Sequence, residues 1–193
     1  MRLIVTEKNI AAGKIAELLS DTKPKSDKVY NTPVYRFKSD GEEQVTIGLR
    51  GHILEVDFVD SLHYGKRLGW YGVDANGDRV EADIPDELPK PPFKKRKPFV
   101  EDGVELLAYA PIEKSPAEKE IIRSLKNLAG KADQIVIATD FDREGELIGS
   151  DAIEMIRQAN ETAPILRARY SALTKGEIEQ AFDVVWLWIL AIP

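Results

Sequence analysis

The fold of this chain is decided by the stretch Gln134-Ile-Val-Ile-Ala-Thr-Asp-Phe-Asp-Arg-Glu-Gly-Glu-Leu-Ile-Gly149. It opens with a short apolar run rich in β-branched residues, which is typical of a strand covered by helices on both faces of a parallel sheet. Acidic residues two apart follow the strand, and a helical pattern follows them. The acids therefore lie at the carboxyl end of a strand, where open α/β sheets bind their ligands.

These acids, Asp140, Asp142 and Glu144, favour a metal site. Carboxylates a few Å apart raise each other's pKa, and a divalent cation relieves that repulsion. Mg²⁺ prefers oxygen ligands, commonly one or two carboxylates together with waters and phosphate oxygens. The alternative is that Asp140 and Glu144 only cap and charge the first turn of a helix, which the helix dipole favours. Capping accounts for one or two acids but not for three that alternate, so we expect the metal site.

The segment Thr139-Asp-Phe-Asp-Arg-Glu-Gly-Glu146 resembles the acidic signature of the Toprim domain in type IA DNA topoisomerases. A second Toprim element is expected on the first strand, and Arg2-Leu-Ile-Val-Thr-Glu-Lys8 predicts a strand ending in Glu7. Other segments resemble archaeal-type topoisomerase I or topoisomerase III, namely Gly51-His-Ile-Leu54, Ala110-Pro-Ile112 and Arg167-Ala-Arg-Tyr-Ser-Ala-Leu-Thr-Lys175. The similarity runs from about Arg2 to Phe182, and such an ordered set is more specific than any single motif.

The resemblance implies a Toprim fold, a Rossmann-like α/β domain with a mostly parallel central sheet flanked by helices. Strand and helix patterns alternate along the chain in agreement, since this order favours right-handed βαβ crossovers. We expect the Toprim domain at residues 1–182, with an irregular, proline-rich basic insertion at about 60–103. Residues 183–193 form an apolar tail that departs from the family and reads as a truncated or altered end. It is expected to pack on the helices or to leave an exposed apolar patch.

The resemblance also implies a site. In the intact enzyme, Mg²⁺-dependent cleavage and religation of one DNA strand relaxes DNA, and the implied catalytic residues are Glu7, Lys8, Asp140 and Asp142. The implied ligands of Mg²⁺ are Glu7, Asp140, Asp142 and Glu144. The expected DNA contacts are Lys8, His52, Arg143, Arg167 and Arg169, with Arg169 favoured over Arg167.

Each basic residue also has a plain structural interpretation. Lys8 can be an ordinary solvated lysine, and His52 a structural histidine. Arg167 and Arg169 can be outward-facing arginines of an edge strand. The basic run Lys94-Lys-Arg-Lys97, with Lys90 nearby, suits phosphate contact but equally suits a solvated, polyproline-like linker.

Type IA enzymes cut DNA through a tyrosine in a later domain, which forms a phosphotyrosyl link. The tyrosines of this chain match no nucleophile motif, so we expect the isolated chain to bind metal and DNA without relaxing DNA. Its expected partners are single-stranded or underwound DNA and the remaining domains of the enzyme. Another Toprim enzyme, of nuclease or primase type, would share Glu7 and the acids but not the segment 167–174. A stand-alone DNA-binding module would not need the acids.

Composition sets the remaining limits. The chain has 193 residues, no cysteine and a formal net charge of −6, which excludes disulfides and argues against general coating of nucleic acids. Any DNA contact must therefore use local basic patches. An apolar run of about 18 residues or a basic leader is not found, so a membrane span is not expected. The expected location is the cytoplasm.

Overall fold

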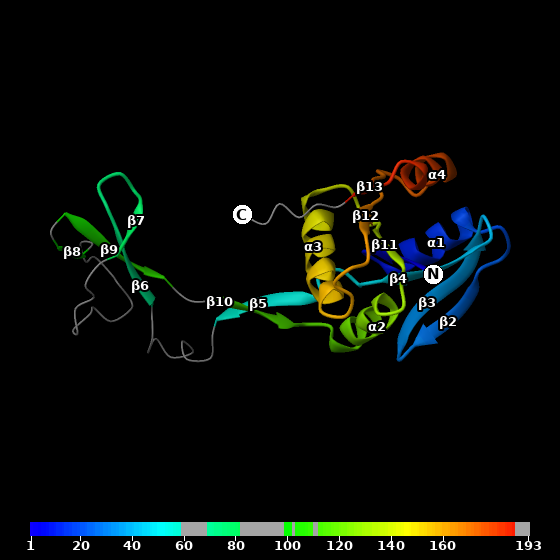
Figure 1. The fold of residues 1–193 in the computed structure, drawn as a ribbon, viewed down its shortest axis with the longest axis horizontal. Coiled ribbons are helices and arrows are strands. Elements are labelled where there is room, and N and C mark those ends of the chain that lie inside the picture. Colours follow the sequence, from blue (N-terminus) through cyan, green and yellow to red (C-terminus); the bar gives the residue numbers. More distant parts are fainter. Residues whose placement is uncertain (59–68, 82–98, 102, 110–111, 188–193) are drawn as a thin grey trace. The chain divides into compact units, whose positions relative to one another are not determined.

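The computed structural model describes residues 1–58, 69–81, 99–101, 103–109 and 112–187 (Figure 1). The chain divides into two compact units, one of Met1–Glu55 with Pro116–Pro193 and one of Val56–Ser115. The predicted insertion at about 60–103 falls within the second unit. Its basic run, with Lys90 and residues 94–97, lies outside the described residues.

The first unit is built on a seven-stranded sheet of order β13-β12-β11-β1-β4-β3-β2. Its four central strands are parallel to one another: β1 (Arg2–Thr6), β4 (Glu42–Gly48), β11 (Gln134–Ile137) and β12 (Ile165–Arg167). Antiparallel strands complete both edges: β2 (Lys25–Val29) and β3 (Thr32–Ser39) on one side, β13 (Trp186–Leu187) on the other. The predicted α/β fold with a mostly parallel central sheet is confirmed.

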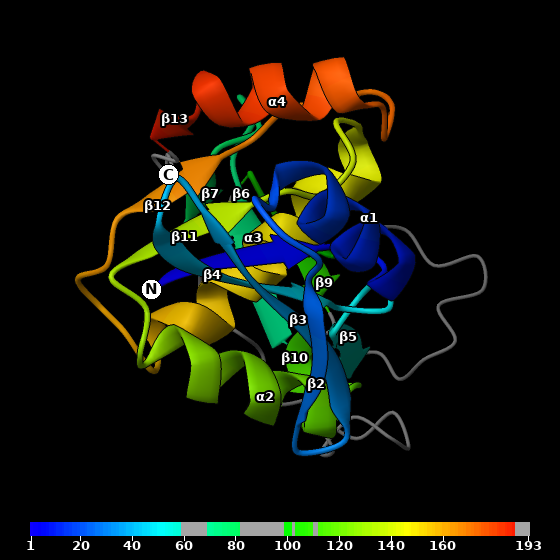
Figure 2. The ribbon, with the colours of Figure 1, turned by 90° about the vertical axis from the view of Figure 1, so that its right-hand side faces the viewer.

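Helices cover both faces of this sheet, and α4 and α2 lie on opposite sides of it in Figure 2. One face carries α1 (Asn9–Leu19) and α4 (Lys175–Asp183), and the other carries α2 (Lys119–Ala129) and α3 (Arg143–Arg157). Side chains of a strand alternate between faces. Leu3 and Val5 of β1 accordingly join the cluster under α2 and α3, while Ile4 joins the cluster under α1 and α4.

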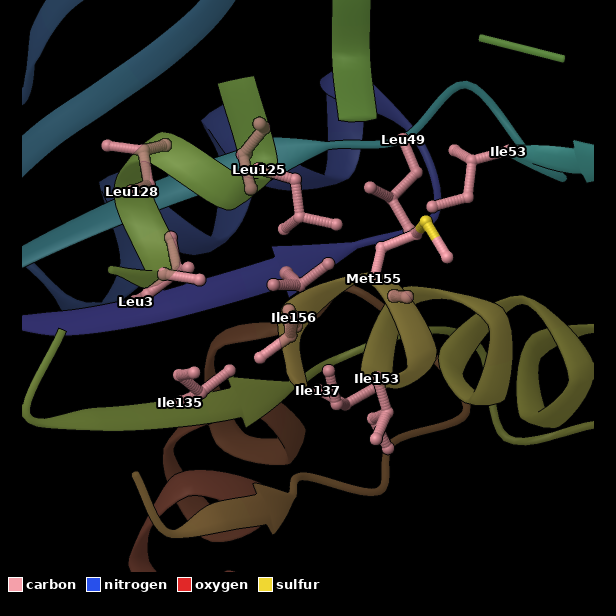
Figure 3. Close-up of a cluster of buried hydrophobic side chains, with 14 of the residues drawn as sticks. Leu3, Leu49, Ile53, Leu125, Leu128, Ile135, Ile137, Ile153, Met155 and Ile156 are labelled. Carbon is pink, nitrogen blue, oxygen red and sulfur yellow. The ribbon is translucent and has the colours of Figure 1, made fainter. Parts of the chain in front are cut away.

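Figure 3 shows the larger of these cores, where side chains of α2 and α3 meet those of β1 and β11. Leu125 and Ile156 are fully buried between the helices and the sheet, against Leu3, Ile135 and Ile137. Burying one such side chain contributes about 1.5–3 kcal/mol. Leu147, predicted on the apolar face of α3, is 51% exposed instead, because it lies on the side of the helix away from this core.

The second unit contains a four-stranded antiparallel sheet of order β7-β6-β9-β8. Its strands are β6 (Gly69–Val73), β7 (Arg79–Val80), β8 (Phe99–Glu101) and β9 (Val104–Tyr109). A separate pair joins β5 (Leu54–Phe58) to β10 (Ile112–Pro116). The sequence predicted β9 but not its partners, because strands of two to five residues are too short to show a clear alternation.

The predicted N-terminal caps of three helices need correction. Ser115-Pro-Ala-Glu118 has the pattern of a capping box and predicts a helix start, but Ser115 belongs to β10 and α2 begins at Lys119. Asn9 is the first residue of α1 rather than its N-cap. Thr174 does precede α4, but its side chain makes no capping hydrogen bond.

The predicted apolar tail is partly described. Trp186 and Leu187 form β13, which pairs with β12 and extends the sheet. Val185 packs against the core cluster under α1 and α4, and Val184 is exposed. Residues 188–193 lie outside the described part of the chain. Across the described residues, every helix is too short or too polar to cross a membrane.

Gly48 fixes the approach of α1 to the sheet edge that carries Glu7. A Cβ atom at Gly48 would lie 2.4 Å from the backbone nitrogen of Asn9, which is closer than non-bonded atoms approach. The amide of Leu49 also donates to the carbonyl of Thr6 at 3.0 Å. The end of β4 and the start of α1 are therefore in backbone contact, and only glycine fits between them.

We predict that Gly48→Ala lowers the free energy of unfolding by at least about 2 kcal/mol, because backbone must move to admit the methyl group. The matched control is Gly176→Ala in the first turn of α4, where an added Cβ has no neighbour within 4 Å. That change should stabilise by up to about 1 kcal/mol. Urea denaturation measures both, and wild-type stability for Gly48→Ala would contradict the packing.

Candidate active site

Glu7 and Asp140 lie at the same edge of the sheet because β1 and β11 are neighbouring parallel strands that end together. The register pairs Val5 with Ile137, and the amide of Ala138 donates to the carbonyl of Val5. Glu7 is buried at 6% exposure, whereas Asp140 is exposed. The strand ends thus bring together two acids that are far apart in the sequence.

The electrostatics of Asp140 show how closely the charged groups are gathered. Burial raises the pKa of Asp140 above its ordinary value, and the charges of Glu7 and Asp142 raise it further. Lys8 and Arg167 lower the pKa, but they do not cancel the rise. The ionised form of Asp140 is therefore less stable in the folded chain than it is in the unfolded chain. This is expected of carboxylates that have too little positive charge around them.

Lys8 supplies part of that positive charge. Its Nζ lies 2.8 Å from Oε1 of Glu7, although the lysine side chain is 66% exposed. The hydrogen bond and charge of Glu7 raise the pKa of Lys8, with smaller contributions from Asp140 and Glu144. Only the lysine end of this ion pair is exposed, since Glu7 is buried, so the ammonium of Lys8 can also reach an anion that arrives from solvent.

Asp142 has a structural duty within the acidic loop. It is the N-cap of α3, and its Oδ1 accepts a hydrogen bond from the amide of Gly145 at 2.8 Å. A Cβ at Gly145 would lie 2.0 Å from the carbonyl oxygen of Asp140, and the hydroxyl of Thr139 donates to the carbonyl of Gly145. The N-cap is therefore Asp142 and not Asp140 or Glu144, but Glu144 does lie in the first turn of α3, where the alternative interpretation expected an acid to favour the helix dipole.

Arg167, the last residue of β12, is buried against this loop and holds it by hydrogen bonds. Its side chain is 2% exposed, and its Nε and Nη2 donate to Oε1 of Glu146 at 2.9 and 2.8 Å. Its other hydrogen bonds go to backbone carbonyls around the acidic loop, those of Ile137, Thr139, Asp140 and Ala168. The prediction that Arg167 contacts a DNA phosphate is corrected, because its buried guanidinium already donates hydrogen bonds to acceptors inside the protein.

The other predicted cations are differently placed. Arg143 is exposed at the first residue of α3. Arg169 is also exposed, with its guanidinium carbon 5.0 Å from the centroid of the Phe141 ring. Both arginines can meet a ligand arriving from solvent, which Arg167 cannot.

His52 approaches the acids from the loop after β4. Arg50 and Gly51 have φ angles of 64° and 97°, a sharp turn that glycine favours. The imidazole then lies between two acids, with Nε2 4.0 Å from Oε1 of Glu144 and Nδ1 3.8 Å from Oδ2 of Asp151. These separations are longer than hydrogen bonds but short enough for attraction when the ring is protonated.

Asp151 and Glu146 were missed in the sequence. Asp151 is 3% exposed on α3, four residues from Met155 and three from Ile148, so it occupies the apolar face of the helix. An acid at a core-facing position is a signal that could have been used. Glu146 was quoted only as the end of the acidic signature, because its pairing with Arg167 joins residues that are remote in the sequence.

The predicted ligands Glu7, Asp140, Asp142 and Glu144 offer carboxylate oxygens, the donors that Mg²⁺ prefers. As the side chains stand, no three acids or histidines among the described residues gather closely enough to hold an ion. The three acids of the loop are exposed; Asp140 and Glu144 can turn without disturbing the core, whereas one oxygen of Asp142 already caps α3. The residues fit a divalent ion chemically. Desolvation and then the charges of Glu7 and Asp142 raise the pKa of Asp140, and a cation would offset the repulsive part of this rise.

Comparison with known proteins gives relatives over nearly the whole chain. Residues 2–173 match the family model described as "Toprim domain". DNA topoisomerase 1 of Archaeoglobus fulgidus is 34% identical over 182 residues, which is 94% of this chain and 22% of that protein. DNA topoisomerase 1 of Thermoplasma acidophilum is 34% identical over 181 residues, covering 94% and 19%. DNA topoisomerase 3 of Dictyostelium discoideum is 26% identical over 186 residues, covering 93% and 19%.

We predict that Arg167→Met lowers the free energy of unfolding by about 3 kcal/mol, because it leaves Glu146 and several carbonyls without their donor. The matched control is Arg169→Met, an exposed arginine two residues away, which should change stability by less than about 1 kcal/mol. Chemical denaturation of both variants decides the point. Equal stabilities of the two variants would mean that Arg167 does not hold the loop.

Proposed function

The chain belongs to the Toprim domain family, and from that premise we propose that it forms the acidic, Mg²⁺-binding part of a type IA DNA topoisomerase site. The resemblance predicted from the motifs is confirmed by the family match and by the topoisomerase relatives. The chain spans about a fifth of the length of the curated relatives it matches. The activity of a whole enzyme is therefore part of the proposal.

One observation carries this proposal. Glu7 follows β1 and Asp140 follows β11, and the charge of the first raises the pKa of the second. A domain that only bound DNA would not need to concentrate acids where the phosphates must come. Phosphodiester chemistry assisted by a metal ion does need them, because the ion then joins the carboxylates to phosphate oxygens.

We assign the roles as follows. Glu7, buried and paired with Lys8, handles a proton at the scissile phosphate, and Lys8 turns from Glu7 to the phosphate when DNA arrives. Asp140, Asp142 and Glu144, with Glu7, hold the metal ion. When bound, Mg²⁺ would supply the positive charge that orients and neutralises the DNA backbone. Arg167 keeps the acidic loop in place and has no contact with DNA.

The DNA itself is proposed to meet the exposed cations around this edge. Lys8, Arg143 and Arg169 are all exposed and suit phosphate oxygens, while His52 adds a donor beside Glu144. Phosphate contacts position a nucleic acid without reading its sequence. The arrangement therefore supports binding of DNA strands in general and gives no sequence preference.

The covalent step would need a tyrosine from elsewhere in the whole protein. Tyr170 is close to the acids, but burial raises its pKa, and the charges of Asp140 and Glu7 raise it further. Its hydroxyl donates to the carbonyl of Ala138 at 2.8 Å. A nucleophile needs a lowered pKa or an adjacent base, so Tyr170 is unsuited to attack. We propose that the remaining domains of the enzyme supply the nucleophile and that this chain alone does not relax DNA.

We predict that Mg²⁺ raises the melting temperature of this chain. Ligand binding to the folded state alone stabilises by about 2.7 kcal/mol at a hundredfold excess over Kd, which is a shift of several degrees for a chain of this size. Replacing Asp140 and Asp142 together by Asn should abolish that shift. Thermal melts with EDTA and with millimolar Mg²⁺ give the comparison.

The same variant should be more stable than wild type without metal. Since the pKa of Asp140 is raised in the folded state, its ionisation costs stability at neutral pH, and this cost disappears as the pH falls below the ordinary value of 3.8. Asn also serves as an N-cap, so the hydrogen bond at Asp142 has a replacement. The control is Glu161→Gln, an exposed acid beyond α3. A double variant that is less stable in EDTA, or that keeps the Mg²⁺ shift, would refute the acidic site.

A further inference from the structure

Phe141 is an exposed aromatic residue between two of the site acids. Its side chain is 53% exposed, although it sits in a loop whose neighbours Thr139 and Gly145 are buried. The guanidinium of Arg169 lies over the ring, 5.0 Å from its centroid. The loop geometry that positions the acids thus also presents an aromatic face with a planar cation beside it.

This ring borders a cavity of about 510 Å³ between the acidic loop and α4. The cavity is lined by side chains of mixed character, including Phe141, Arg169, Ser171, Gln180, Ala181 and Val184. Its size is within the range of about 300–1,000 Å³ that is usual for small-ligand pockets. One nucleotide therefore fits the cavity, whose lining offers both apolar surface and hydrogen-bonding groups.

We propose that this cavity binds one unpaired nucleotide of single-stranded DNA, with its base against Phe141 and its phosphate at Arg169. The proposal rests on the function proposed above and adds a subsite to it. Every base has a flat face that stacks on an aromatic ring, and the arginine next to the ring adds a phosphate contact. The bound nucleotide would then lie directly beside Asp140 and Asp142.

The cavity lining contains one cation, Arg169, and one anion, Glu177. Oε2 of Glu177 accepts hydrogen bonds from the amides of Ser171 and Ala172, both at 2.8 Å. These donors hold the carboxylate in place and offset part of its charge. Arg169 is then the cation that faces an incoming phosphate, on the same side of the cavity as Phe141.

The strand must be unpaired for this contact. In a duplex both faces of each base are covered by stacking, and a side chain reaches a base face only when the base is splayed out. A protein segment is the rival occupant, since Val184 is also exposed at 55% in this cavity. A protein partner would use the apolar surface of Phe141 without regard to its aromatic character, and this difference separates the two.

The test compares binding of a short single-stranded oligothymidylate to wild type, Phe141→Leu and Phe141→Tyr. Leu keeps an apolar side chain but removes the ring, so affinity should fall at least about fivefold, and Tyr should restore it. Leu147→Ala is the matched control, because Leu147 is equally exposed, at 51%, yet does not line the cavity. A duplex of the same length should bind wild type and Phe141→Leu equally.

A second measurement locates the base directly. Oligonucleotides carrying 5-iododeoxyuridine photocrosslink to aromatic rings on which the base stacks, and mass spectrometry should find the crosslink at Phe141. Wild-type affinity of Phe141→Leu, or crosslinks elsewhere, would overturn the subsite while the Mg²⁺-dependent melting shift could still uphold the proposed function. If the Mg²⁺-dependent melting shift were absent but the crosslink at Phe141 were found, the proposed metal site would be refuted and the nucleotide subsite upheld.

Discussion

The hydrogen bonds of Arg167 are the constraint on which the acidic edge depends. A buried guanidinium is tolerated only when its donors are satisfied and its charge is paired. Arg167 meets both conditions by binding Glu146 and the carbonyls of Thr139 and Asp140. It thereby ties β12 to the loop between β11 and α3, so the acids cannot drift away from the end of the sheet. Arg167 belongs to the segment 167–175, which resembles archaeal-type topoisomerases. This segment therefore contributes to the site by holding the acidic loop in place.

Close backbone packing completes the edge on the other side. Gly48 lets β4 touch the start of α1, directly after Glu7 and Lys8, and Gly145 lets the acidic loop fold back on Asp140. Each glycine removes a methyl group that would separate two backbones. The backbones that carry Glu7 and Asp140 are consequently held at one edge of the sheet by the core on both of its faces.

Much of the fold and of the candidate site was predictable from the sequence. Apolar strands followed by polar residues located Glu7 and Asp140, since the carboxyl ends of parallel strands share one edge. The sequence did not reveal the burial of Arg167, because a strand of three residues does not show which of its side chains faces inward. It also did not reveal that Asp142, predicted only as a metal ligand, is the N-cap of α3, because Asp suits both uses. The partners of β9 in the second unit, β6, β7 and β8, were missed because local pattern is weak where pairing between distant segments decides the structure.

The central claim is that the acids at this edge form one cation site. Mn²⁺ binds oxygen ligands as Mg²⁺ does, and its unpaired electrons broaden the NMR signals of nearby nuclei. Titration of the isotopically labelled chain with Mn²⁺ should first broaden the backbone amide signals of Glu7, Asp140 and Glu144. Broadening that begins at another acidic surface, such as that of Asp21 and Asp40, or that spreads evenly over all exposed acids, would contradict the claim.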